Sequence, residues 1–297
     1  MKKIIAIVGP TASGKTKLAI ELAQILKTEI ISADSRQFYK EMCIGTAVPE
    51  PKELTVVKHH FIQHISIFQS YNVGDFEQDF LTLTQNLFHH KDTLILVGGS
   101  GLYIDAACKG LDNLPSRNNE IRRQLENDLQ TNGIESLQKK LLSLDAEYYQ
   151  KIDLQNPHRL IRAIEILLQS KGKKMNELLQ NDNKRNFETL YIGLNTERSK
   201  LYERINKRVD IMIKKGLIEE ARELYPHRKL QALQTVGYRE LFSYFDGNID
   251  LSFAISEIKK NTRRFAKRQL TWFRKNKNIH WFDIKESSNN IAKELGL

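Results

Sequence analysis

Four short apolar runs along the chain, each followed by glycine or small polar residues, are typical of buried β-strands. They occupy residues 4–8, 29–32, 93–97 and 190–194. After the first run, Leu18, Leu22 and Leu26 trace one face of a helix. Strands that alternate with helices predict an α/β fold with a P-loop-type, doubly wound parallel sheet flanked by helices.

The middle of the chain has a different texture, with helical periodicity and no strand pattern between about 118 and 180. Asn156 and Pro157 predict a helix start, and Leu160 and Ile161 open its apolar face. Another long helix is predicted over about 197–216. We therefore expect a catalytic core formed by 1–112 and 186–297, interrupted by a helical insertion domain at 113–185.

A glycine-rich segment between the first strand and the first helix matches the phosphate-loop pattern G-x-x-x-x-G-K-[ST]. Its glycines let backbone N–H groups turn toward an anion, and the helix N-terminus adds partial positive charge. Lys15 is expected to reach the terminal phosphates, and the Thr16 hydroxyl to ligate Mg²⁺. The predicted diphosphate-binding residues are Gly9, Thr11, Ala12, Ser13, Gly14, Lys15 and Thr16.

Ligands of a parallel sheet bind at the carboxyl ends of the strands, and Gly9, Asp34 and Ser100 all fall there. The most apolar strand, 93–97, is followed by Gly98 and Gly99 rather than by the acid usual in nucleotide-hydrolysing enzymes. Asp34 is the strand-end acid near the start of the chain. It is a candidate for a metal ligand and equally for a general base beside the phosphate site.

The charge of the chain points to a polyanionic partner. The formal net charge is +10 over 297 residues, which favours nucleic acid first and an acidic membrane surface second, against an uncommitted basic surface. Residues 259–277 contain nine Lys or Arg and no Asp or Glu. On a helical wheel Ile258, Phe265, Trp272 and Phe273 form an apolar stripe that we expect to pack in the core, with the basic residues mostly opposite, available to a phosphate backbone.

Only two cysteines occur, widely spaced, so neither a disulfide framework nor a structural zinc site is expected. No apolar run approaches eighteen residues, the length typical of a membrane span. These features predict a cytoplasmic protein with no membrane association, and we expect it to be a monomer.

Several ordered motifs together resemble the tRNA dimethylallyltransferases, also called tRNA isopentenyltransferases. The motifs are GPTASGKT (9–16), ISADSRQFY (31–39), IGTAVP (44–49), LVGGSGLY (96–103), NPHRLIRAIEIL (156–167), TVGYRE (235–240) and AKRQLTWFRK (266–275). The resemblance is to the bacterial type, without a zinc-finger extension. It implies Mg²⁺-dependent transfer of a dimethylallyl group from its diphosphate to N6 of the adenosine 3′-adjacent to the anticodon in tRNA.

Site roles follow from the same resemblance. It implies that Lys15 neutralises the diphosphate, that Asp34 accepts a proton from the adenine amino group and that Arg208 stabilises the departing pyrophosphate. The residues it implies for tRNA contact are Asp34, Ser35, Arg36, Gln37, Ser100, Arg122, His158, Arg159, Leu160, Ile161, Arg162, Gln234, Gly237, Tyr238, Arg239, Lys267, Arg268, Gln269 and Arg274.

The chain departs from the family pattern at Ser100, where threonine is common, and at Cys43, where an acid often stands. Three alternatives remain: a P-loop small-molecule kinase, a prenyltransferase acting on free adenine nucleotides, and a nucleic-acid-binding module whose phosphate loop is regulatory. The basic tract and the Arg159–Arg162 pair favour tRNA as the acceptor over these.

Overall fold

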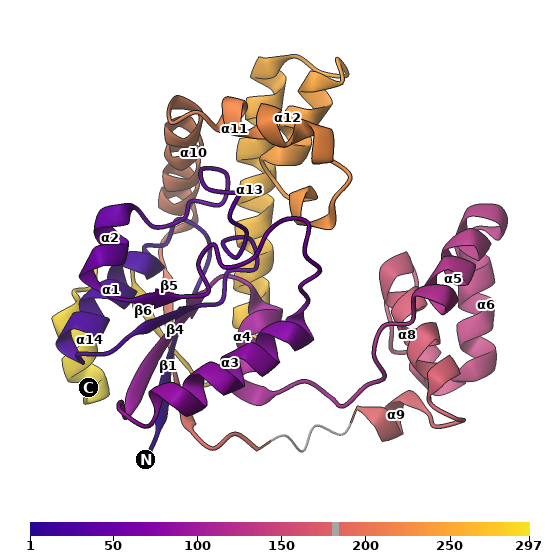
Figure 1. Cartoon of the computed structure of the whole chain (residues 1–297), viewed down its shortest axis with the longest axis horizontal. Coiled ribbons are helices and arrows are strands. Elements are labelled where there is room, and N and C mark those ends of the chain that lie inside the picture. Colours follow the sequence, from indigo (N-terminus) through magenta and orange to yellow (C-terminus); the bar gives the residue numbers. More distant parts are fainter. Residues whose placement is uncertain (180–183) are drawn as a thin grey trace. The chain divides into compact units, whose positions relative to one another are not determined.

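The computed structural model describes residues 1–179 and 184–297 and confirms the α/β fold (Figure 1). All six strands pair in parallel, in the order β3-β2-β4-β1-β5-β6. Their bounds are β1 Lys3–Val8, β2 Ile30–Ser32, β3 His59–His60, β4 Thr93–Gly98, β5 Glu188–Asn195 and β6 Ile279–Asp283. The four apolar runs of the sequence correspond to β1, β2, β4 and β5, the interior of this sheet.

Alternate residues of β1 serve the two faces of the sheet, as strand geometry requires. Ile5 and Ile7 pack on one face with α1 (Lys15–Ile25) and α14 (Ser288–Leu295). Ile4 belongs to the core on the other face. Because β1 is buried on both faces, it is apolar along nearly its whole length.

This α/β unit contains seven further helices in its described residues. They are α2 Pro51–Val56, α3 Val73–Leu87, α4 Gly101–Lys109, α10 Arg198–Lys214, α11 Leu217–Leu224, α12 Tyr238–Phe245 and α13 Leu251–Phe273. Two short 3₁₀ helices, η1 Tyr225–His227 and η2 Gln231–Leu233, lie between α11 and α12. No helix in the described chain combines the length and apolarity needed to cross a bilayer.

The chain divides into two compact units, one formed by 1–109 and 185–297, the other by 110–184. In the second, helical unit the described residues form α5 Asn119–Asn132, α6 Ile134–Leu144, α7 Ala146–Tyr149, α8 Pro157–Gln169 and α9 Met175–Leu178. The Asn156 side chain accepts the N–H of Arg159 at 3.2 Å, so the helix start predicted there is confirmed. The unit has its own apolar core, in which Leu160 and Ile164 are fully buried.

The sequence pattern did not reveal two strands. β3 is only two histidines long, and β6, at the edge of the sheet, buries only Ile279 and Phe282 of its five residues. An edge strand has fewer neighbours to bury it, so its apolar signal is weak. Neither omission changes the fold class.

Candidate active site

The loop after β1 has the backbone of an anion receptor. Gly9, Ala12 and Gly14 have positive φ values of 144°, 63° and 90°, and helix α1 starts without a side-chain cap. The N–H groups of its first turn therefore face outward unpaired, together with the positive end of the helix dipole. The Ser13 hydroxyl is buried and has no partner in the described chain. Such a loop is built to receive phosphate oxygens.

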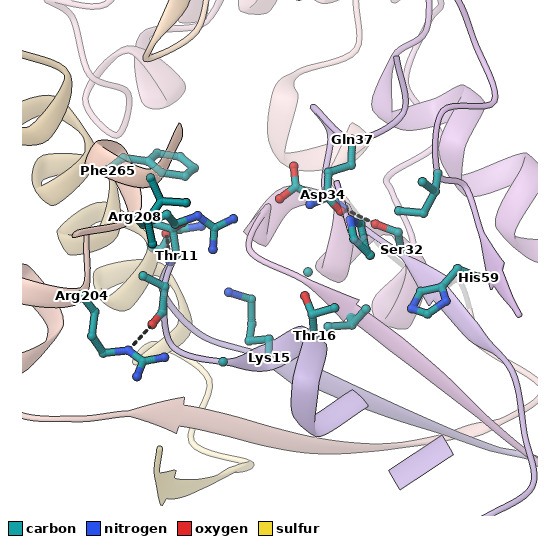
Figure 2. A pocket seen from close by; sticks show the side chains of 18 of the residues that line it. Thr11, Lys15, Thr16, Ser32, Asp34, Gln37, His59, Arg204, Arg208 and Phe265 are labelled. Carbon is teal, nitrogen blue, oxygen red and sulfur yellow. Dashed lines mark hydrogen bonds between the residues drawn. The ribbon is translucent and has the colours of Figure 1, made fainter. Parts of the chain in front are cut away.

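A cavity of about 490 Å³ opens above this loop (Figure 2). Four cationic side chains line it, Lys15, Arg204, Lys207 and Arg208, and Asp34 is the one acid among the described lining residues. This excess of positive charge in a concave site favours a ligand with several negative charges, such as a diphosphate.

A bound anion would favour the charged forms of Lys15 and of the neighbouring Arg208. The Lys15 Nζ donates to the Pro10 carbonyl oxygen at 2.7 Å. Burial, opposed by Asp34 and reinforced by Arg208, lowers the pKa of Lys15 to about 8. Burial likewise lowers the pKa of Arg208, again against the effect of Asp34. An anion placed among these cations would restore their pKa values and so bind tightly.

Asp34 stands just after β2 in a defined orientation. Its Oδ1 accepts the N–H of Arg36 at 3.0 Å, and its own N–H donates to the Ser32 Oγ at 3.3 Å. Its other carboxylate oxygen has no hydrogen-bond donor within the described residues. The turn thus fixes the carboxylate while leaving one oxygen able to accept a proton.

A second cavity, of about 480 Å³, meets the first. Five residues line both cavities: Thr11, Asp34, Arg208, Phe265 and Gln269. The carboxylate and a guanidinium therefore stand where an anion cavity joins a second chamber with aromatic walls. That arrangement suits a reaction between a bound phosphate ester and a second, planar substrate.

The structure distributes the remaining predicted tRNA-contact residues over three places. Gln37 lines the first cavity. Others line the second cavity: Ser35, Arg36, Ser100, Gln234, Gly237, Arg239 and Arg268. Lys267 and Arg274 are exposed on and just after α13, while Arg122 and the segment from His158 to Arg162 belong to the helical unit, with His158 and Arg159 exposed.

Burial corrects three of these assignments. Leu160, Ile161 and Tyr238 are at most 3% exposed, so their side chains support the fold instead of meeting RNA. The Tyr238 hydroxyl donates to the Glu220 Oε1 at 2.7 Å. The same Glu220 carboxylate accepts the N–H of Gly45, a wall of the second cavity, at 2.9 Å. Tyr238 thus braces the cavity from behind.

The basic tract also differs from the expectation. Lys259 pairs with Asp210 at 2.6 Å and Lys260 pairs with Glu257, so two of the charges are relieved by carboxylates outside the tract. In the expected core stripe, Phe265 and Trp272 are each 38% exposed and line the second cavity, whereas Phe273 is buried. The prediction of a wholly core-docked stripe was wrong because the helix borders a cavity.

Sequence reasoning missed part of the cationic wall of the first cavity. Arg204 donates from its Nε to the Ala12 carbonyl oxygen at 2.8 Å, and Lys207 lines the same cavity. Both lie on α10 one turn or less from Arg208. The i, i+3, i+4 spacing of three basic residues on one predicted helix was the available signal.

Comparison with known proteins agrees with this geometry. The family model described as IPP transferase matches residues 37–276. A tRNA dimethylallyltransferase of Christiangramia forsetii is 59% identical over 97% of this chain and 95% of its own length. The corresponding protein of Flavobacterium johnsoniae is 54% identical over 98% of this chain and 96% of its own.

Solved structures give the same result. The tRNA isopentenylpyrophosphate transferase of Bacillus halodurans is 38% identical, with a TM-score of 0.73 over 99% of this chain and 94% of its own. A eukaryotic dimethylallyltransferase solved acting on tRNA is 25% identical, with a TM-score of 0.83 over 98% of this chain and 78% of its own. The phosphate loop, the two joined cavities and these similarities lead to one conclusion: the chain belongs to the tRNA dimethylallyltransferase, or IPP transferase, family of enzymes.

Proposed function

We propose that the protein transfers the dimethylallyl group of dimethylallyl diphosphate to N6 of the adenosine 3′-adjacent to the anticodon of tRNA. The carrying observation is the position of Asp34 and Arg208 at the junction of the two cavities. The diphosphate would occupy the cationic cavity, and the adenine the aromatic one. The dimethylallyl carbon would then lie between them, beside both residues.

In the reaction the bond between dimethylallyl C1 and the diphosphate oxygen breaks as N6 bonds to C1. N6 loses a proton, which we assign to the open oxygen of Asp34 because it is the one acid among the described residues lining either cavity. The leaving diphosphate retains the bonding electrons, and Lys15 and Arg208 stabilise its charge. The N–H groups of the phosphate loop also stabilise the charge of the diphosphate.

We further propose Mg²⁺ as the metal ion. The described chain has no cluster of three or more His, Cys, Asp or Glu that would form a protein-only metal site. Mg²⁺ needs no such cluster, because it keeps several waters and uses substrate phosphates with one or two protein oxygens. Thr16 and Ser32 offer hydroxyl oxygens to the first cavity, so the donors fit. When bound, the ion would neutralise charge on the diphosphate.

We propose that residues of both units contact the tRNA, with the helical insertion taken as 113–185 and the core as 1–112 and 186–297. Candidates with accessible side chains are His158, Arg159, Lys267, Arg268 and Arg274. The adenine would leave its stack to enter the second cavity, which costs little in an unpaired anticodon loop. The protein would act as a monomer.

One assay tests this function against its alternatives. Purified protein is given Mg²⁺, labelled dimethylallyl diphosphate, and either unmodified tRNA or AMP. We expect label on tRNA alone, at the adenosine after the anticodon. Label on AMP alone would indicate a free-nucleotide prenyltransferase, and ATP turnover without prenyl transfer would indicate a kinase; either result would overturn the proposal.

A further inference from the structure

The side chain of Gln269 joins two loops that the sequence separates widely. Its Oε1 accepts the N–H of Thr11 at 2.8 Å, and its Nε2 donates to the Gly99 carbonyl oxygen at 2.9 Å. Only 6% of the residue is exposed. We call this arrangement of Thr11, Gly99 and Gln269 the Gln269 bridge. It ties the phosphate loop (9–16) and the glycine loop after β4 (98–101) to helix α13.

The chemistry of the two partners fixes the orientation of the amide. Thr11 presents a donor and Gly99 presents an acceptor, so exchanging the oxygen and nitrogen of Gln269 would set like groups against each other. Both polar ends of the side chain are therefore used within the protein. A buried amide whose oxygen and nitrogen are both engaged has little left to offer to RNA.

The glycine loop is shaped to admit the helix. A Cβ on Gly99 would lie 2.2 Å from the Gln269 Nε2, and a Cβ on Gly101 would lie 2.3 Å from the Trp272 Cδ1. Gln269 and Trp272 are three residues apart, on one face of α13. At these two points a Cβ on the loop would require the Gln269 or Trp272 side chain to move.

The Gln269 bridge lies at the junction of the two cavities, because Gln269 and Thr11 line both of them. The exposed basic residues Lys267 and Arg268 lie on the same helix, immediately before it. Thr11 opens the run from Thr11 to Thr16 that should receive the diphosphate. Since its N–H is already bound by Gln269, its backbone serves the position of the loop and not the ligand.

We propose that Gln269 is a positioning residue for the diphosphate and not a tRNA contact. It fixes the phosphate loop in the position in which the loop's N–H groups can bind the leaving diphosphate. This inference rests on the proposed function and refines it. It assigns α13 two separable tasks. Gln269 serves diphosphate binding, and its neighbour Lys267 serves tRNA binding.

The test compares Gln269→Leu, Gln269→Glu and the matched control Lys267→Gln, two residues away on the same helix. Three quantities are measured: the Kd of inorganic pyrophosphate by calorimetry with Mg²⁺, the Kd of unmodified tRNA by filter binding, and the KM of dimethylallyl diphosphate. Leucine keeps the volume of glutamine but leaves both bridge partners unpaired. We expect it to raise the pyrophosphate Kd and the KM about tenfold and to leave the tRNA Kd unchanged.

Gln269→Glu should be more severe, because one carboxylate oxygen would face the Gly99 carbonyl oxygen and add negative charge beside the anion cavity. Lys267→Gln should show the reverse split, with a raised tRNA Kd and an unchanged pyrophosphate Kd. Thermal melting of each variant reports whether it folds.

A higher tRNA Kd for Gln269→Leu with an unchanged pyrophosphate Kd would overturn the proposal in favour of an RNA contact. Unchanged values for both, or a parallel loss of both with a large fall in Tm, would overturn it as well. Pyrophosphate binding needs no turnover. A wild-type protein that binds pyrophosphate but modifies no tRNA would therefore refute the proposed function and leave the bridge open to the same comparison.

Discussion

At the scale of single residues, the site works by leaving a few groups incompletely satisfied. Lys15 is half-buried among other cations, and Asp34 keeps one oxygen without a donor in the described chain. The Ser13 hydroxyl is buried and unpaired there. Burial of the unpaired Ser13 hydroxyl costs stability in the free protein, and a bound phosphate oxygen would relieve it.

Replacement of Asp34 by asparagine tests the base directly. Asparagine keeps an oxygen that can accept the Arg36 N–H but cannot take up a proton. We expect kcat to fall by about 10²–10⁴-fold while the tRNA Kd stays unchanged. Asp92→Asn, an equally conservative change at an exposed position outside both cavities, is the control. Turnover of the Asp34 variant close to that of wild type would remove Asp34 as the base.

The lowered pKa of Lys15 predicts a pH dependence. With a pKa of about 8 in the free protein, Lys15 is charged below that pH and becomes neutral as the pH rises through it. Because only the ammonium attracts the diphosphate, kcat/KM for dimethylallyl diphosphate should decline above about pH 8. In Lys15→Arg, which stays charged, this limb should disappear from the pH–rate profile. An identical limb in the variant would assign it to another group.

At the scale of elements, the apolar pattern predicted the interior strands of the sheet. It did not predict which helices contact the loops at the strand ends. Strands β1, β2, β4 and β5 have neighbouring strands on both sides and buried central residues, so each contains a continuous apolar run. The glycine loop and the phosphate loop could likewise be placed at strand ends. The contacts of α13 with the two loops join residues 258 and 170 positions apart, and no local pattern encodes such a pairing.

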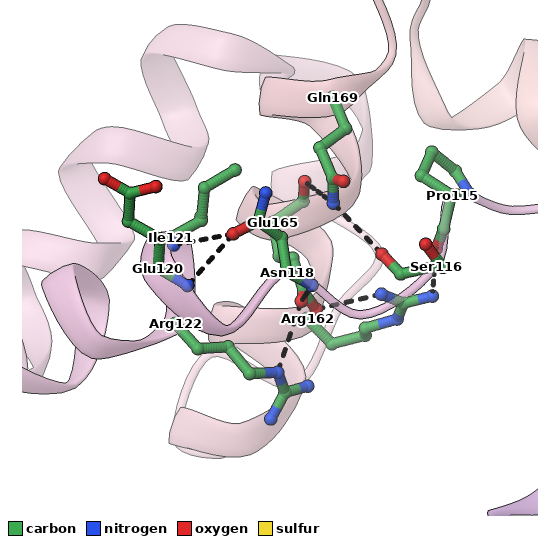
Figure 3. Close-up of polar contacts among 9 residues, drawn as sticks. All are labelled: Pro115, Ser116, Asn118, Glu120, Ile121, Arg122, Arg162, Glu165 and Gln169. Carbon is green, nitrogen blue, oxygen red and sulfur yellow. Dashed lines mark hydrogen bonds and ion pairs between the residues drawn. The ribbon is translucent and has the colours of Figure 1, made fainter.

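The helical unit has a similar organising contact, around the buried carboxylate of Glu165 on α8 (Figure 3). It accepts the Arg162 Nη1 at 2.8 Å, the Arg122 Nε at 3.3 Å and the Asn118 N–H at 2.7 Å. Burial would raise the pKa of Glu165, but these hydrogen bonds hold it below its ordinary 4.5. Glu165 thus joins α8 to the start of α5 and orients two arginines predicted to meet RNA.

Glu165→Gln should therefore loosen this junction. The variant turns an amide donor toward guanidinium donors, so we expect a loss of about 2 kcal/mol in the local stability of α5 and α8. Hydrogen exchange of peptides spanning 119–132 and 157–169 should accelerate, with peptides of the sheet as the internal control. Because the Glu165 pKa is depressed on folding, wild type should lose the same protection as the pH falls below about 4.5. Unaltered exchange in the variant would contradict this role.

At the scale of the whole molecule, the chain forms two units with separate cores, and of its net charge of +10 the α/β unit carries +9 and the helical unit +1. The two cavities belong to the α/β unit alone. If the helical unit serves tRNA only, substitutions there should change the affinity for RNA and leave the affinity for the diphosphate intact. The separation of the units makes this division of labour measurable.

Arg159→Ala provides that measurement, since Arg159 is exposed on α8 and is not part of the Glu165 contact. A lost phosphate contact should reduce the slope of log Kd for tRNA against log salt by about one. The KM of dimethylallyl diphosphate should not change. Thr271→Ala, an exposed neutral change on α13, serves as the control. An unaltered salt slope for Arg159→Ala would show that this arginine makes no phosphate contact with tRNA.

The order of the strands has a consequence for biosynthesis. β1, the first strand to leave the ribosome, lies between β4 and β5, and Gly9 packs against the carbonyl of Leu194 at the end of β5. The loop after β1 also needs its hydrogen bond to Gln269, a residue that is synthesised much later. The helical unit is translated in between and needs none of these late partners for its own core. In a nascent chain the helical unit should therefore fold first. The phosphate loop, although it is translated earlier, should become a functional anion receptor last.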